Sequence, residues 1–263
     1  MGGVRLSQLT VHSVRSLFGS MGRFSLFAGS VARVVARRKL PLRSLLQQME
    51  RTGIESLTVV NLCAFFIGIV LVAQIASMLA RFGAKTEVST VIGLAFVREI
   101  GPVFAAIMFT GRIGTGIAAE LSSMMATEQI DALRLMGVDP IARLVAPRVV
   151  ASVIMLPALT VVADMVGLFS GMVAGLASGD FSPAQFMQKA IESLRILDVV
   201  ASVSKAAAFG LLVGLTACWI GMGSDRSSAS VGVASTRTMV AGVLGILISD
   251  FLLTTLFIRL GGN

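Results

Sequence analysis

Five long apolar runs, separated by short polar stretches, dominate the pattern of this chain. The hydrocarbon core of a bilayer, about 30 Å thick, is crossed by roughly 20 residues of apolar helix, and each run reaches that length. The predicted membrane-spanning helices cover residues 57–80, 88–118, 147–177, 198–222 and 235–260. The second and third runs exceed one crossing and contain Pro102 and Pro157. Because a proline inside a helix removes a hydrogen-bond donor, we expect bends or short re-entrant pieces there.

Small residues recur at helical spacing within two of these runs. Gly167, Gly171 and Gly175 form overlapping GxxxG spacings in the third run, and Gly210 and Gly214 form one in the fourth. Such spacings allow two helix backbones to approach closely inside a membrane. We expect them to form helix–helix packing seams.

A basic, amphipathic segment precedes the first run, and we treat residues 1–56 as a region distinct from the membrane domain at 57–263. Its apolar residues recur near helical spacing among arginines: Leu6, Leu9, Leu17, Met21, Phe24 and Phe27. This pattern is typical of a helix that lies in the headgroup region with its apolar face toward the lipid tails. A disordered basic tail is the alternative. We expect no cleaved signal peptide, because no apolar run of about 7 to 15 residues follows the first basic residues.

The distribution of basic residues predicts the orientation of the chain. Of the 22 Lys and Arg residues, nine precede the first apolar run, and the positive-inside rule places such a segment in the cytoplasm. Five crossings then put the C-terminus outside. The loops assigned to the cytoplasm are 120–148 and 223–237, and those assigned to the outside are 81–87 and 178–197. The last of these contains Phe181, Phe186 and Ile191 among polar residues and fits a small amphipathic helix and a plain loop equally well.

Composition excludes several classes of protein. The chain has 263 residues, of which 55% are hydrophobic and 14% charged, and its mean hydropathy is +0.88, which lies outside the range of water-soluble domains. Its net charge of +8 orients the chain in the membrane and does not indicate nucleic-acid binding. Cys63, Cys218 and His12 form no metal-ligand or nucleophile motif. We therefore predict an all-α membrane protein that is not an enzyme.

Five ionisable residues lie deep inside the predicted crossings, where charge is costly and indicates function. They are Arg98, Glu99, Asp164, Lys205 and Asp250. Counted from the outer end of each run at 1.5 Å per residue, all lie roughly 12 to 20 Å deep, so they can neutralise one another. The preferred pairs are Glu99 with Lys205 and Arg98 with Asp250. Three interpretations remain open: a polar gate in a cavity for an amphipathic substrate, ion pairs that only fix helix register, and a proton relay.

The loop between the second and third crossings has the pattern of a short amphipathic helix. Ile130, Leu133 and Met136 repeat at helical spacing, and Gly137 followed by Pro140 is an ordinary helix stop. We predict this helix at about 127–137. An apolar stripe with acidic flanks fits either a helix on the membrane surface or a protrusion that docks into the groove of a partner protein.

Several blocks between residues 97 and 148 carry a resemblance to a known family. They read Val97-Arg98-Glu99-Ile100-Gly101-Pro102, Gly111-Arg112-Ile113-Gly114, Ala118-Ala119-Glu120-Leu121, Ala126-Thr127-Glu128-Gln129-Ile130-Asp131-Ala132-Leu133 and Met136-Gly137-Val138-Asp139-Pro140. Together with Pro147-Arg148, they resemble the signature of the MlaE/YrbE-type permeases, the membrane subunits of ABC transporters that work with MCE-domain proteins. The chain length and the five crossings fit as well.

The resemblance implies a homodimeric permease, with an N-terminal interfacial helix and five transmembrane helices, in the inner membrane of a double-membraned bacterium. Such permeases move phospholipid between the inner and outer membranes and so serve outer-membrane asymmetry. The implied partners are a cytoplasmic P-loop ATPase, a periplasmic MCE-domain protein and a small STAS-domain protein bound to the ATPase. This chain has no GxxxxGK[ST] motif. We therefore expect the ATPase to bind ATP and Mg, and this chain to hold no cofactor.

The same resemblance assigns candidate site residues. The coupling helix, seated in the ATPase, would use Glu128, Gln129, Asp131, Leu133 and Met136. A lipid cavity at the dimer interface would place the substrate site or gate at the intramembrane charges Arg98, Glu99, Lys205 and Asp250. An ion-coupled secondary transporter that uses these four charges is the alternative function. A membrane anchor that recruits proteins and moves nothing is a further one.

Overall fold

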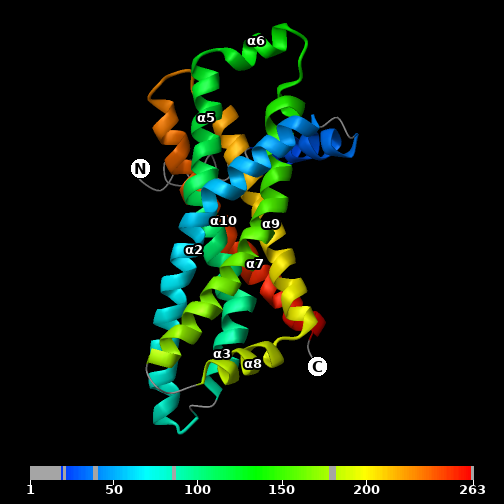
Figure 1. Ribbon diagram of the computed structural model, residues 1–263. Coiled ribbons are helices and arrows are strands. Elements are labelled where there is room, and N and C mark those ends of the chain that lie inside the picture. Colours follow the sequence, from blue (N-terminus) through cyan, green and yellow to red (C-terminus); the bar gives the residue numbers. More distant parts are fainter. Residues whose placement is uncertain (1–18, 20–21, 38–40, 85–86, 178–181, 262–263) are drawn as a thin grey trace, which may run out of the picture.

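The computed structural model describes the chain apart from residues 1–18, 20–21, 38–40, 85–86, 178–181 and 262–263, and every regular element within the described residues is a helix (Figure 1). This confirms the all-α prediction. The main helices are α2 (Leu42–Arg81), α6 (Gln129–Leu135), α7 (Ala146–Ala177), α8 (Pro183–Ser193), α9 (Ile196–Met222) and α10 (Ser230–Gly261).

The second span is one long helix interrupted by two π-helical turns. It consists of α3 (Val88–Ala95), the π-helical turn η2 (Phe96–Ile100), α4 (Gly101–Phe109), the π-helical turn η3 (Thr110–Gly114) and α5 (Thr115–Ala126). A third π-helical turn, η4 (Ile141–Val145), precedes α7. Pro102 is the second residue of α4, two positions after the end of η2, whereas Pro157 lies within a continuous α7. The described parts of these two spans therefore contain π-helical turns in place of the re-entrant pieces considered above.

Within the described residues, five helical stretches are long and apolar enough to cross a membrane: Leu42–Arg81, Val88–Ala126, Ile141–Leu176, Ile196–Met222 and Ser230–Arg259. This confirms the predicted number of crossings. The helices extend beyond the predicted limits, since the first begins at Leu42 and the second continues to Ala126. The reason is that an apolar run marks only the part of a helix in contact with hydrocarbon. Backbone hydrogen bonding continues through polar residues such as Arg51 and Glu120.

The spans form an elongated bundle with α6 at one end and α8 beside α3 at the other (Figure 1). We refer to these as the α6 end and the α8 end. α7 packs along α2 and α9, and α10 packs on α9 and α5. Large buried side chains, among them Phe96, Phe109 and Phe209, fill the space between the helices.

The predicted glycine seams are places of close backbone contact. A Cβ added at Gly167 would collide with the ring of Phe96, and one added at Gly210 would collide with the backbone of Ser152. Gly68 of α2 was not predicted to take part, but it lies directly against Gly167 and Ser170. Because the added atom would meet backbone, the two helices could accept it only by moving apart.

We expect Gly68→Ala to lower the free energy of unfolding by about 1–3 kcal/mol, the range found for overpacked cores. The added methyl group would collide with the carbonyl oxygen of Gly167, which is backbone and cannot rotate away. Thermal unfolding of the detergent-solubilised protein measures the effect. Gly232→Ala is the matched control, because a Cβ there meets nothing within 4 Å. Equal melting temperatures for the two variants would contradict the packing argument.

Two short helices flank the bundle. Residues 22–36 are helical and lie toward the α6 end of the bundle (Figure 1). Their Phe24 and Phe27 pack on Trp219 of α9, with ring centroids 6.0 and 5.3 Å from that of the tryptophan. The predicted apolar positions Leu6, Leu9, Leu17 and Met21 lie outside the described residues.

The loop between α7 and α9 forms a helix, α8, which decides between the two alternatives left open above. The Ser182 hydroxyl caps α8 by accepting a hydrogen bond from the Gln185 backbone N–H at 3.3 Å. Phe186 and Ala190 are buried, and Ala190 lies against Gly93 of α3. Phe181 lies outside the described residues.

Candidate functional site

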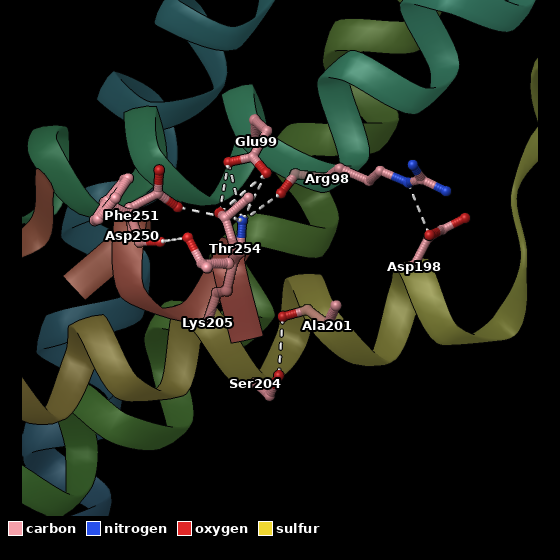
Figure 2. A network of polar contacts seen from close by, with 10 residues as sticks. Arg98, Glu99, Asp198, Ala201, Ser204, Lys205, Asp250, Phe251 and Thr254 are labelled. Carbon is pink, nitrogen blue, oxygen red and sulfur yellow. Dashed lines mark hydrogen bonds and ion pairs between the residues drawn. The ribbon is translucent and has the colours of Figure 1, made fainter. Parts of the chain in front are cut away.

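A buried lysine joins three spans near the α8 end. The Lys205 ammonium lies 2.9 Å from both carboxylate oxygens of Glu99 and 3.2 Å from Oδ1 of Asp250 (Figure 2). It also donates to Thr254 Oγ1 at 2.6 Å and to the Arg98 carbonyl oxygen at 3.0 Å. Its side chain is 2% exposed, whereas that of Glu99 is 41% exposed. We call Glu99, Lys205, Asp250 and Thr254 the lysine cluster.

The predicted pair of Glu99 with Lys205 is therefore present, but the predicted pair of Arg98 with Asp250 is wrong. Arg98 Nε instead donates to Asp198 Oδ1 at 2.8 Å, and Figure 2 shows its side chain directed away from the lysine cluster. Consecutive residues on a helix point about 100° apart, so Arg98 and Glu99 face different neighbours. Asp250 is already paired with Lys205. Asp198 lies on the same helix as Lys205, two turns closer to the α8 end.

Two residues of this site were not predicted from the sequence. Asp198 was assigned to the boundary of a crossing and so was not counted among the intramembrane charges. Thr254 donates its hydroxyl to the Glu99 carboxylate at 3.1 Å. The sequence signal for Thr254 is its position four residues after Asp250, because residues i and i+4 share a helix face. Asp164, the fifth predicted charge, is buried against Gly101 and is not part of the lysine cluster.

The π-helical turn η2 explains how the backbone takes part. Pro102 has no N–H, so it cannot bond to the carbonyl four residues earlier, which is that of Arg98. That carbonyl accepts the hydrogen bond from Lys205 instead. π-helical turns insert an extra residue into a helix and are frequent at functional sites. The proline predicted to bend the second span therefore leaves the Arg98 carbonyl free to bind the lysine.

The residues predicted to contact an ATPase lie at the α6 end. The predicted helix forms over Gln129–Leu135, preceded by Glu128 in the left-handed region at φ 56. Asp131 pairs with Arg226 at 2.7 Å and with Arg134 at 3.0 Å. Arg226 also lies 3.9 Å from Glu128, so the loop between α9 and α10 supports α6.

Side-chain exposure on α6 differs from the predicted stripe. Leu135 is 91% exposed and Met136 is 68% exposed, whereas Ile130 is fully buried. Leu133, a predicted contact, is half-buried. The free apolar surface of α6 thus lies at its C-terminal end. Leu135 was missed because it lies five residues after Ile130, about 140° around the helix, and so off the predicted stripe.

Comparison with known proteins identifies the family. The family model described as Permease MlaE matches residues 45–256. The chain belongs to the MlaE permease family. The intermembrane phospholipid transport system permease protein MlaE of Haemophilus influenzae is 34% identical over 251 residues, which cover 94% of this chain and 95% of the relative. A probable ABC transporter permease protein of Rickettsia felis is 37% identical over 240 residues, which cover 91% of this chain and 93% of the relative.

A plant protein is also similar to this chain. The chloroplastic protein TRIGALACTOSYLDIACYLGLYCEROL 1 of Arabidopsis thaliana is 36% identical over 238 residues, covering 90% of this chain and 68% of the plant protein. As an MlaE-family member, this chain is a multi-pass permease of an ABC transporter. Permeases of this class work with an ATPase and a substrate-binding component.

In this MlaE-family permease, we expect Asp198→Asn to lower the free energy of unfolding by about 1 kcal/mol, since it removes a charge-assisted hydrogen bond. Asp198 accepts from Arg98 and, through Oδ2, from the backbone N–H of Arg195 at 2.9 Å, which closes the first turn of α9. Thermal unfolding in detergent measures the loss. Glu192→Gln, an exposed carboxylate on α8, is the control and leaves the melting temperature unchanged. No difference between the variants would mean that the Arg98 pair adds no stability.

Proposed function

We propose that this chain is the membrane permease of a phospholipid transporter in the bacterial inner (cytoplasmic) membrane, moving phospholipid between the inner and outer membranes. The observation that carries the proposal is the lysine cluster, a charged group inside spans that are otherwise apolar. Intramembrane charge is retained where it serves function. The name of the Haemophilus relative, a phospholipid transport permease, agrees with this assignment.

The chemistry of the site suits an amphipathic substrate. Arg98 keeps 47% of its side chain exposed, and a guanidinium offers paired N–H donors that match a phosphate group. Glu99 is half-exposed beside it and can accept from an ammonium headgroup. Lys205 is buried and neutralised, so its role is to hold η2, α9 and α10 together. Movement of α10 would exchange these contacts and open or close the site.

The energy source is a separate cytoplasmic P-loop ATPase that binds ATP and Mg. Its groove would receive α6, with Glu128, Gln129 and Asp131 at the start and Leu133, Leu135 and Met136 along the apolar side. The α6 end is then cytoplasmic, together with the N-terminus, and the α8 end and the C-terminus are periplasmic. A periplasmic MCE-domain protein would exchange lipid at the α8 end, and a STAS-domain protein would bind the ATPase.

A homodimer is the proposed assembly. α10 is the span with the fewest buried residues, although it carries part of the lysine cluster. Its exposed side chains include Ile248, Phe251 and Leu252, which share one face of the helix. A second copy packed on α10 would enclose the half-exposed side of the cluster as one wall of a lipid cavity.

The test is transfer of a fluorescent phospholipid from vesicles that contain the permease, its ATPase and the MCE-domain protein to acceptor vesicles. We expect transfer to require ATP and to be unchanged by a proton ionophore. Transfer that follows the proton gradient would favour the ion-coupled transporter. No transfer, with the ATPase still bound, would favour the anchor.

A further inference from the structure

An ion-pair network joins α2, α5 and α7 near the α6 end. Glu120 of α5 accepts hydrogen bonds from Arg148 of α7 at 2.8 Å and from Arg51 of α2 at 3.1 Å. Arg51 also lies 3.6 Å from Glu55 on its own helix. We call Arg51, Glu120 and Arg148 the Glu120 triad. Glu120 and Arg148 belong to two of the motifs that carry the family resemblance, and the proposed function gives neither of them a role.

Stability alone does not explain the buried arginine of the triad. The Arg148 side chain is 3% exposed, and it also donates to the Leu144 carbonyl oxygen at 3.2 Å. Within the described residues, however, its Nε has no hydrogen-bond partner, and an unsatisfied buried donor costs free energy. Apolar residues can often replace a buried ion pair without loss of stability. A role in fixing the geometry of the helices accounts for this arginine better.

The α6 helix is joined to the helices on either side of it by two bends in the chain. Glu128 precedes α6 at φ 56, and Gly137 follows it at φ 74. A force applied to α6 would be lost if α5 and α7 could move apart on the far sides of these bends. The contact between Glu120 and Arg148 prevents this, because it ties α5 to α7 across 28 positions of sequence. The two helices are therefore held together where the segment that contains α6 begins and ends.

Helix α9 lies against both α5 and α7 beside the triad. A Cβ added at Gly221 would collide with Leu121 of α5, and one added at Gly214 would lie 3.2 Å from the Cα atom of Val149 of α7. Each of these contacts is one residue beyond the triad member of the same helix. Lys205 lies about 14 Å from Gly214 along α9, at 1.5 Å per residue. A joint displacement of α5 and α7 therefore reaches the lysine cluster through close backbone packing.

We propose that the Glu120 triad couples α6 to the transmembrane helices. Glu120 and Arg148 are positioning residues that make α5 and α7 move together when the ATPase displaces α6, and Arg51 transmits the movement to α2. Ion-pair networks and rigid helices are structures that can carry coupling between distant sites. The proposal rests on the proposed function, because it requires that ATP hydrolysis moves α6. The triad itself binds neither substrate nor nucleotide.

The test combines Glu120→Gln with Arg148→Met in the full-length permease. Removing both charges avoids the uncompensated buried charge that a single change would leave, so the double variant should fold and bind the ATPase. In vesicles with the ATPase and the MCE-domain protein, ATP hydrolysis should continue, while phospholipid transferred per ATP falls about fivefold. Loss of folded protein alone would lower hydrolysis and transfer in parallel. Glu50→Gln with Arg143→Met makes the same two substitutions at exposed positions and should leave the ratio unchanged.

A second measurement uses the permease alone in nanodiscs. Hydrogen–deuterium exchange of the backbone amides of Gln129–Leu135 should be about fivefold faster in the double variant, since local opening becomes easier when α5 and α7 are no longer tied. Exchange in α9 around Lys205 should stay the same, because the glycine contacts of α9 are unchanged. The exposed control pair should exchange like the wild type throughout.

Three results would overturn the role of the triad. A wild-type ratio of transfer to hydrolysis in the double variant would show that the triad only stabilises the fold. Loss of ATPase binding would show that the triad shapes the docking surface and does not transmit movement. Unchanged exchange in α6 would show that the ion pair does not hold α5 and α7 together. The proposed function is tested separately by ATP-dependent transfer in the wild type, so a wild type and a double variant that transfer equally well would remove the triad alone.

Discussion

Lys205→Met is expected to abolish phospholipid transfer and to lower the free energy of unfolding by about 3 kcal/mol. Removing one partner of a buried ion pair leaves the other charge without compensation, which is strongly destabilising. Here the substitution leaves two carboxylates, those of Glu99 and Asp250, without the positive charge that neutralises them. Thermal unfolding in detergent and the vesicle transfer assay measure the two effects on the same preparation.

A second variant separates stability from function. Combining Lys205→Met with Glu99→Gln removes one of the uncompensated charges and should restore part of the stability, while transfer stays at least tenfold below the wild type. If the double variant regains both stability and transfer, the lysine cluster only fixes helix register, and the substrate does not use it. If it regains neither, the missing lysine contacts to Thr254 and the Arg98 carbonyl outweigh the charge.

Leu135→Asp combined with Met136→Asp is expected to weaken ATPase binding more than tenfold and to leave the fold intact. Both side chains are exposed at the end of α6, so their loss costs little packing, whereas apolar anchors dominate the energy of protein interfaces. Co-purification of the ATPase measures binding, and thermal unfolding reports the fold.

The matched control places the same charges at the opposite end of the bundle. Ile196 and Leu197 are also exposed, and Ile196→Asp with Leu197→Asp should leave the ATPase bound. Full ATPase recovery with the α6 variant would place the docking surface elsewhere on this face. Loss with both variants would point to a general effect of added charge.

The sequence was sufficient for features that depend on local pattern. Apolar run length sets the number of spans, and the Gly137 and Pro140 stop locates α6. The pairing of Arg98 was wrong because it depends on how α9 and α10 rotate about their axes, which hydrophobicity does not specify when a span is apolar all round. The choice between Asp198 and Asp250 is made by this rotation.

The ends of the helices also could not be predicted from the apolar pattern. The first helix begins at Leu42 because residues such as Gln48 and Arg51 favour helix about as well as Leu does.

The backbone carbonyl released by Pro102 gives the lysine cluster a further property. The Lys205 nitrogen is surrounded by oxygens from two carboxylates, a hydroxyl and a carbonyl, a set of ligands that would also suit a bound alkali ion. Here the cation is covalently tethered to α9. It cannot be diluted away or exchanged for sodium or potassium, so the lysine cluster keeps its cation when the salt on either side of the membrane changes.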